Sequence, residues 1–220
     1  MPYDAESDFT GITNLTFTGT ALLYTGRPGN FSSFKDLIAQ AKAKPGSINM
    51  ATWGPGSAAD LYIRYVNQRL GVDIVPVPYK GAAPALTAAL GGEVDMSFWG
   101  IGAIVPHIKS GKVRGLVVAP KRSPLVDVPT FPDIGIPDPG IVQYFGLYAP
   151  AKTPAPIVER LNNEFVKAVR SPVTTKFLAT QTFEPVGNSP VEFAAFMKAD
   201  RENAGRLLQS LGVKPQDVPQ

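Results

Sequence analysis

Residues 49–60 read NMATWGPGSAAD, and this stretch indicates how the chain around it folds. The pattern predicts the end of a strand, a glycine-rich turn and the first turn of a helix, with Ser57 as the N-cap. Gly54 and Gly56 carry no Cβ, so the backbone can approach a ligand closely there. The first N–H groups of a helix lack intrahelical partners, and such a turn therefore favours an anion.

Two anions fit this turn: a cofactor phosphate and the carboxylate of a small acid. The segment from Gly54 to Ala59 loosely matches the G-x-G-x-x-A fingerprint of dinucleotide-binding proteins. That fingerprint requires an acidic residue about 20 positions further on, but the strand expected over 73–78 is followed by Tyr79 and Lys80. The sequence thus argues against a dinucleotide, and we expect no cofactor. The alternative is an ordinary turn whose glycines only permit a tight bend.

The composition excludes several kinds of protein. The chain has 220 residues, of which 44% are hydrophobic and 18% charged, as in a globular protein with a normal core. It has no cysteine and one histidine, His107, so we expect no thiolate or multi-histidine metal site and no cysteine nucleophile. The net charge is +3, and the basic excess over 109–122 has no interleaved aromatic residues. We therefore expect no nucleic-acid partner.

The middle of the chain alternates between strand and helix patterns. We predict strands over 48–52, 73–78, 94–98 and 113–118, and helices over 57–70, 82–90 and 101–110. This alternation predicts a parallel sheet with helices on both faces, in which ligands bind at the carboxyl ends of the strands. The predicted ligand-binding residues at those ends are Thr52, Trp53, Gly54, Pro55, Gly56, Ser57, Ala58, Tyr79, Lys80, Trp99 and Gly100.

Different patterns flank this block. Residues 11–26 predict one strand, Ser33 begins a helix, and residues 144–149 predict a buried strand. Further helices are expected to begin at Thr153, Ser171 and Ser189, the last with a capping box to Glu192. The apolar residues expected to face inward are Ile157, Leu161, Phe165 and Ala168 on one helix, and Phe193, Met197, Leu207 and Leu211 on another. We expect two α/β lobes with a ligand cleft: 1–29 plus 121–220, and 30–120.

Four segments carry a resemblance to a known family, in order and with matching spacing. They are VPVPYKGAAPA at 75–85, PHIKSGK at 106–112, FGLYAP at 145–150 and PIVERLN at 156–162. Residues 9–213 resemble the Bug-type solute-binding receptors of tripartite tricarboxylate transporters. The resemblance implies the fold of type II periplasmic binding proteins, a small carboxylate ligand, membrane transporter subunits as partners, a periplasmic location, and neither catalysis nor metal binding. It also implies that the loop matching Thr52–Ala58 holds the carboxylate, and that Tyr79-Lys80 and Trp99-Gly100 complete that wall.

The sequence departs from the family pattern in two respects. Trp99-Gly100 stands where the family usually has Asp-Asn, which removes an acid able to hold an amine or hydroxyl of the ligand. The family also begins about 90 residues earlier, so this chain resembles a truncated member with an incomplete first lobe. Its first nine residues are polar and show no signal peptide. An incomplete lobe would leave a sheet edge open, and we therefore expect self-association.

Three functions follow from these observations. A receptor for a small carboxylate, with Trp53 and Trp99 favouring an apolar or aromatic body, is the first. A serine hydrolase using Ser57 is the second, although Ser57 lacks the G-x-S-x-G pattern and His107 is the sole histidine available as a base. A truncated remnant that binds no ligand and serves as a structural domain is the third.

Overall fold

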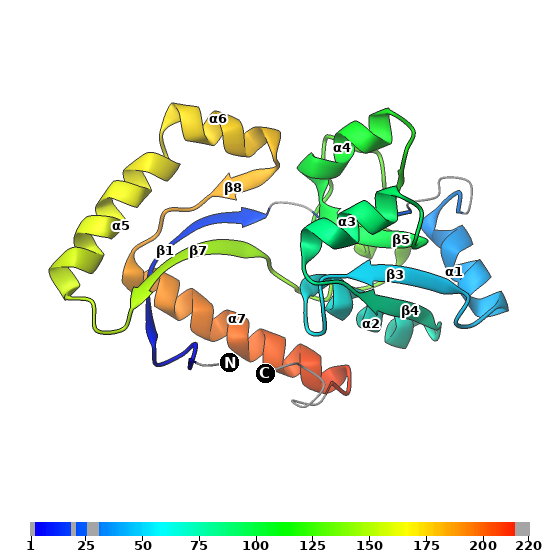
Figure 1. The fold of residues 1–220 in the computed structure, drawn as a ribbon, viewed down its shortest axis with the longest axis horizontal. Helices are drawn as coiled ribbons and strands as arrows, with labels where there is room; N and C mark the ends of the chain where they lie inside the picture. The colour runs from blue at the N-terminus through cyan, green and yellow to red at the C-terminus, as the bar shows by residue number, and fades with distance from the viewer. Residues whose placement is uncertain (1–2, 19–20, 26–30, 214–220) are drawn as a thin grey trace. The chain divides into compact units, whose positions relative to one another are not determined.

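The computed structural model describes residues 3–18, 21–25 and 31–213 (Figure 1). The elements, in chain order, are β1 (Phe9–Thr18), β2 (Ala21–Thr25), α1 (Phe34–Ala43), β3 (Ile48–Thr52), α2 (Ala58–Leu70), β4 (Ile74–Pro78), α3 (Ala82–Leu90), β5 (Met96–Gly100), α4 (Ile101–Lys109), β6 (Arg114–Ala119), the 3-10 turn η1 (Pro132–Ile134), β7 (Tyr144–Pro150), α5 (Ala155–Val169), α6 (Pro172–Thr180), β8 (Phe183–Pro185) and α7 (Pro190–Ser210). Every helix and strand expected between 48 and 118 forms, with ends shifted by at most two residues.

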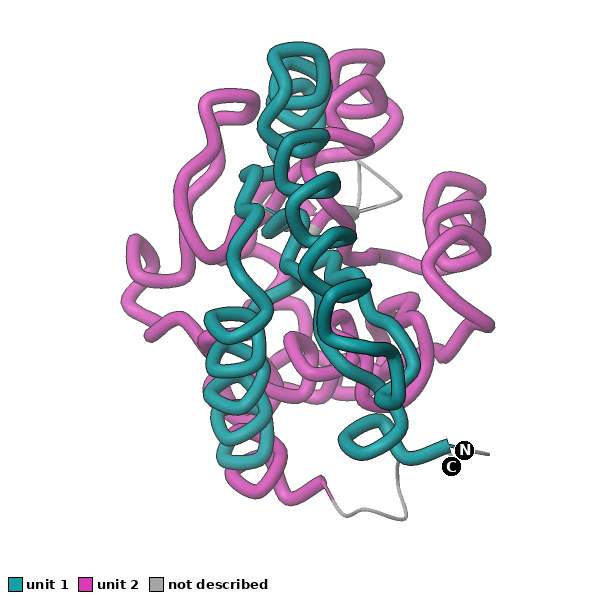
Figure 2. Tube along the Cα trace, turned by 90° about the vertical axis from the view of Figure 1, so that its left-hand side faces the viewer, with its two compact units in different colours: residues 1–19, 142–206, 220 teal, residues 20–141, 207–219 magenta. Residues whose placement is uncertain are grey.

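The chain divides into two compact units, coloured separately in Figure 2. Unit 1 comprises residues 1–19, 142–206 and 220, and unit 2 comprises 20–141 and 207–219. The lobes expected from the sequence had their boundaries at 29/30 and 120/121, so the observed boundaries differ from the expected ones. Strand β2 belongs to the sheet of unit 2 because it pairs with β5 and β6. Residues after 120 also return to that unit: Thr130 bridges to Val118, and Phe131 is buried in its core.

The sheet of unit 2 has the strand order β4-β3-β5-β2-β6. Strand β3 runs parallel to β4 and β5, whereas β2 lies antiparallel between β5 and β6. The expectation of a wholly parallel sheet is therefore wrong at β2. A helical crossover keeps successive strands parallel, but β2 follows β1 without an intervening helix and can insert in the opposite direction. The single strand expected over 11–26 is likewise two strands, β1 and β2, in different sheets; residue 26 lies outside the described residues.

Helices cover both faces of this sheet and bury two separate apolar clusters. The cluster under α1 and α2 includes Leu37, Ile63 and Phe98. The cluster under α3 and α4 includes Ala89 and Ile104. Strands β3 and β6 are mostly buried between these layers, whereas β4 at the edge of the sheet leaves Val75 exposed. Helix starts and ends agree with the sequence as well: Ser33 caps α1 by accepting from the Asp36 N–H, and Gly71 closes α2 with a left-handed φ of 62°.

Unit 1 has a smaller sheet with the antiparallel order β7-β1-β8. Helix α7 packs on it through Phe193, which is fully buried. The ring of Phe193 lies against two glycines: a Cβ built on Gly11 would lie 2.7 Å from it, and one built on Gly146 would overlap it. On α5, the Asn162 side-chain amide donates to the Ile12 carbonyl at 2.9 Å. Small residues on the strands therefore allow a large aromatic ring to approach the sheet.

The helix starts of unit 1 test three predicted caps. Ser171 accepts from the Thr174 N–H, and Ser189 exchanges hydrogen bonds with Glu192, so both predictions are confirmed. Thr153 is not the cap of α5, because the helix begins at Ala155 and Pro154 occupies the cap position. The predicted inward face of that helix is also wrong in part.

Ile157 is 50% exposed and Phe165 is 38% exposed. The described sheet of unit 1 has three strands, and it does not cover the whole apolar stripe of the helix. Among the described residues, no helix is both long and apolar enough to cross a membrane, and no cluster of His, Asp or Glu could hold a metal ion.

Candidate functional site

The turn between β3 and α2 forms as the sequence predicts. Strand β3 ends at Thr52, and the Tyr79 N–H donates to the Thr52 carbonyl at 2.9 Å. Gly54 and Gly56 adopt φ angles of 110° and 75°, in the region that favours glycine. The Ser57 N–H donates to the Gly54 carbonyl at 3.2 Å, which closes the turn. The two glycines therefore shape a tight connection that leads directly into the helix.

Ser57 is the N-cap of α2, and Asp60 completes a reciprocal cap that the sequence analysis missed. The Ser57 hydroxyl accepts from the Asp60 N–H at 3.4 Å. The Asp60 carboxylate accepts from the Gly56 N–H and from Arg64 Nε, each at 2.9 Å. Asp60 is 2% exposed, so the ion pair with Arg64 offsets a buried negative charge beside the turn. The signal for this role was present as Ser-x-x-Asp, a variant of the capping box.

Two N–H groups at the start of α2 stay available for a ligand. The N–H groups of Ser57, Asp60 and Leu61 all have acceptors. Within the part of the chain that the structure describes, those of Ala58 and Ala59 have none. These groups carry the positive end of the helix dipole, so the start of α2 can bind an anion.

Two buried polar atoms next to the turn also lack partners. Thr52 is 1% exposed, and neither its hydroxyl nor the indole N–H of Trp53 has a hydrogen-bond partner among the described residues. A buried polar group without a partner costs about 1–3 kcal/mol. Two of the buried polar atoms without a partner thus lie where a ligand is expected, and others lie elsewhere, among them side-chain atoms of Asn14 and Thr16 on β1.

The carboxyl ends of β4 and β5 lie on the same side of the sheet as the turn, because β3 is parallel to both strands. The ring of Trp99 lies edge-on to that of Trp53, with centroids 6.0 Å apart. Trp53, Tyr79 and Trp99 are each partly buried against the cluster under α3 and α4. Gly100 ends β5 and is the N-cap position of α4. The fold therefore brings both tryptophans together.

Lys80 is different from the other predicted site residues. It follows β4 and is exposed, and its ammonium group makes no hydrogen bond or ion pair with the described residues. Pro55 is also exposed at the turn. The structure thus places Lys80 just after the carboxyl end of β4, and its ligand-binding role stays a prediction.

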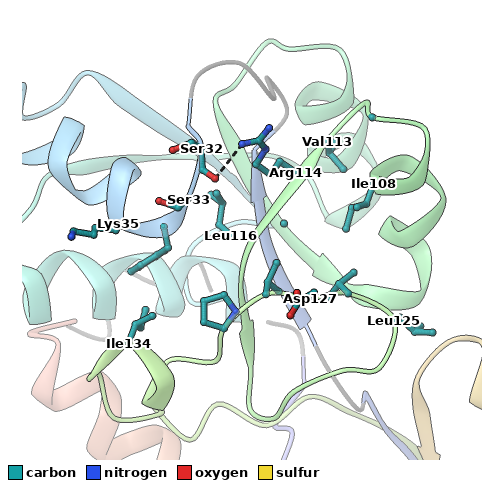
Figure 3. A pocket seen from close by; sticks show the side chains of 16 residues that line it. Ser32, Ser33, Lys35, Ile108, Val113, Arg114, Leu116, Leu125, Asp127 and Ile134 are labelled. Carbon is teal, nitrogen blue, oxygen red and sulfur yellow. Dashed lines mark hydrogen bonds between the residues drawn. The ribbon is translucent and has the colours of Figure 1, made fainter.

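A cavity of unit 2 lies at the opposite ends of the strands from this turn (Figure 3). Its volume is about 780 Å³, and the Arg114 guanidinium at its rim donates to the Ser32 carbonyl at 3.1 Å. Arg114 begins β6 and, like Met96 at the start of β5, pairs with Thr25. The cavity therefore opens at the amino ends of these strands, and none of the predicted site residues lines it.

His107 does not lie in a catalytic arrangement. It is near the end of α4, its carbonyl accepts from the Lys112 N–H, and its side chain makes no hydrogen bond with the described residues. The Ser57 hydroxyl accepts from the Asp60 N–H. Among the described residues, no basic side chain is hydrogen-bonded to that hydroxyl, as a serine nucleophile would require.

Comparison with known proteins defines the class first. Two solved structures from Rhodopseudomonas palustris share the fold: one solved with adipate (TM-score 0.88, 29% identity) and MatC with bound malate (TM-score 0.80, 28% identity). They cover 96% and 95% of this chain, and each alignment spans 71% of the solved protein. The periplasmic binding protein BugD matches as well (TM-score 0.85, 28% identity, 94% of this chain), so the fold is the α/β fold of periplasmic binding proteins.

The family follows from the sequence. The profile of the tripartite tricarboxylate transporter family receptor matches residues 1–213, and the chain belongs to that family. Protein BugT of Bordetella pertussis is 30% identical over 97% of this chain. A relative from Bordetella bronchiseptica is 29% identical over 98% of it. The chain spans 66% and 64% of the lengths of these two curated relatives. The predicted resemblance to Bug-type receptors is confirmed.

Proposed function

We propose that this chain is a solute-binding receptor that captures a small carboxylate for a tripartite tricarboxylate-type transporter. The observation that carries the proposal is the turn from β3 to α2, where the N–H groups of Ala58 and Ala59 and the hydroxyl of Thr52 have no partner among the described residues. Unpaired donors on one turn, next to a helix N-terminus, suit a carboxylate. The ligands of the R. palustris relatives, adipate and malate, are carboxylates too.

The proposed ligand-binding residues are those at the three strand ends: Thr52–Ala58, Tyr79, Lys80, Trp99 and Gly100. The edge-to-face pair of Trp53 and Trp99 offers apolar contact area with little loss of side-chain entropy. We therefore propose a ligand with an apolar or aromatic body between or beside its carboxylates. Trp99-Gly100 supplies no acid, so the proposed ligand has no amine to be paired there.

The wider biological role is proposed from the family. Its members are periplasmic binding proteins, so we propose a periplasmic location, a partnership with membrane transporter subunits, and no catalytic activity. We also propose self-association through unit 1.

Calorimetric titration with a panel of aliphatic and aromatic dicarboxylates tests the proposed site. The variant Ser57→Ala removes a hydroxyl that can donate to the ligand, and it should weaken binding by about 1.5–3 kcal/mol, roughly ten- to hundredfold. The tryptophan emission should shift on binding because both indoles lie at the site.

Ser33→Ala is the matched control. Ser33 caps α1 in the same way that Ser57 caps α2, with its hydroxyl accepting at 3.2 Å from the N–H three residues on. Each variant should lose about 1 kcal/mol of stability from the cap, but Ser33→Ala should bind the ligand normally. If no carboxylate binds the folded protein, the chain is a structural domain without receptor activity. Equal binding by wild type and Ser57→Ala would remove Ser57 from the site.

A further inference from the structure

Unit 1 contains a second cavity that shares no residue with the proposed carboxylate site. It lies between the start of β1, the strand β7 and the second half of α7, and its volume is about 600 Å³. That volume is within the range of about 300–1,000 Å³ that small-molecule sites occupy. Its aromatic walls are Tyr3, Phe9, Tyr144 and Tyr148.

The aromatic walls are held by contacts with each other and with the core. The rings of Tyr3 and Phe9 meet edge to face, with centroids 5.5 Å apart. The Tyr148 hydroxyl donates to the Tyr144 hydroxyl at 3.3 Å, and the Tyr148 ring lies 5.4 Å from Phe193. Three of these side chains keep 40–48% of their surface exposed. Ring faces and edges are therefore accessible to a molecule in the cavity.

The charges that line the cavity sum to a negative value. Glu6 and Asp200 are acidic, and Arg201 is the basic residue among the lining residues. Arg201 forms an ion pair with Glu6, which neutralises both charges. The carboxylate of Asp200 has no hydrogen bond or ion pair with a described residue, and burial raises the pKa of this carboxyl group. An unpaired, partly buried carboxylate beside aromatic rings is unusual in a chain whose net charge is +3.

We propose that this cavity binds a small organic cation, an amine or quaternary ammonium compound, with Asp200 as its counter-ion. A carboxylate that has lost part of its hydration gains from an opposite charge. Aromatic rings attract the same cation through their quadrupoles and also contact its alkyl groups. A carboxylate ligand would be repelled here, so this site and the proposed receptor site select opposite charges.

Choline and its neutral isostere 3,3-dimethylbutan-1-ol test the proposal by calorimetry on the full chain. Choline should bind at least about tenfold more tightly than the alcohol, because the two differ in charge and hardly in shape. In Asp200→Asn this preference should disappear. Phe9→Leu keeps an apolar side chain and removes a ring, and it should weaken choline binding severalfold.

Glu202→Gln is the matched control, since Glu202 is exposed on the same helix and the change in net charge is identical. This variant should bind choline as the wild type does. Hydrogen exchange should show choline-dependent protection in β7 and in the second half of α7, which also localises the site if Asp200→Asn folds poorly. The proposal is overturned if choline fails to bind at millimolar concentration, binds no better than the alcohol, or binds Asp200→Asn unchanged.

Discussion

Unit 2 and unit 1 are built from similar elements but differ in how much of their apolar surface the sheet covers. Unit 2 has five strands with a buried cluster on each face. In unit 1 the described sheet has three strands, and its helices expose Val173 at 81% and Phe177 at 62%. The apolar residues along one face of a helix therefore do not show how much of that face is buried. The extent of the sheet beneath the helix decides the buried area.

Replacing Phe193 should have the largest effect, because unit 1 has few other buried side chains. The buried apolar side chains among the described residues of unit 1 are Ile12, Ala149, Val169, Leu178 and Phe193. Phe193→Ala should destabilise unit 1 by about 3–5 kcal/mol through the lost burial and the cavity left behind. Hydrogen exchange measured by mass spectrometry should show β1 and β7 deprotected while β3 to β6 keep their protection.

The control is Val191→Ala on the same helix, where the side chain is 79% exposed and the expected change is within about 0.5 kcal/mol. Uniform loss of protection in both units after Phe193→Ala would show that they unfold together, and the contrast drawn above would not hold for stability.

Gly146→Ala should destabilise unit 1 less than Phe193→Ala does, at the same place in its core. The added methyl group would overlap the fully buried ring of Phe193 and approach Tyr148 at 3.0 Å. Overpacking of this kind costs about 1–3 kcal/mol, which chemical denaturation can measure. Gly205→Ala on α7 is the opposite case: a Cβ there meets nothing within 4 Å. It should stabilise the helix by about 0.5–1 kcal/mol, and destabilisation by both changes would disprove the packing argument.

Exposed apolar side chains of unit 1 should also promote self-association. Val173 and Phe177 lie four residues apart on α6, and therefore on one face of it. The joint replacement by serine should weaken association about tenfold, or ~1.4 kcal/mol, while Leu125→Ser in unit 2 should not. Sedimentation and small-angle scattering at several concentrations measure this. A radius of gyration of roughly 17 Å at every concentration, as for a compact monomer, would refute self-association.

The carboxyl groups at the helix starts should respond to acid in the same way in both units, so we expect the smallest difference between the units here. Backbone N–H groups of Ser32 and Ser189 hold the pKa values of Asp36 and Glu192 below their ordinary values of 3.8 and 4.5. Because the folded pKa is depressed, the stabilisation is present above the unfolded pKa and is lost as the pH falls through the folded one. NMR titration of the two carboxyl groups should show both midpoints lowered, and an unshifted midpoint for Glu192 would disprove its capping role.

Several local features could be predicted because they depend on neighbouring residues. Ser33, Ser171 and Ser189 cap helices through the residues three positions later, and the strand-turn-helix at 48–70 needs only its glycines and its apolar pattern. The cap at Thr153 was mispredicted, because α5 begins at Ala155 and Pro154 occupies the cap position. Hydrogen bonds between residues three or four positions apart can thus be predicted from the sequence where the start of the helix is also predicted correctly.

By itself, the sequence determined the α/β class, the family, and the residues that meet at the carboxyl edge of the sheet. Only the tertiary structure decided that β2 inserts antiparallel, that Asp60 pairs with Arg64 beside the turn, and that Ile157 on α5 stays exposed. The physical reason is range. Helix capping and strand alternation arise within a few residues, whereas strand direction, burial and the pairing of a buried charge depend on segments that are distant in the chain.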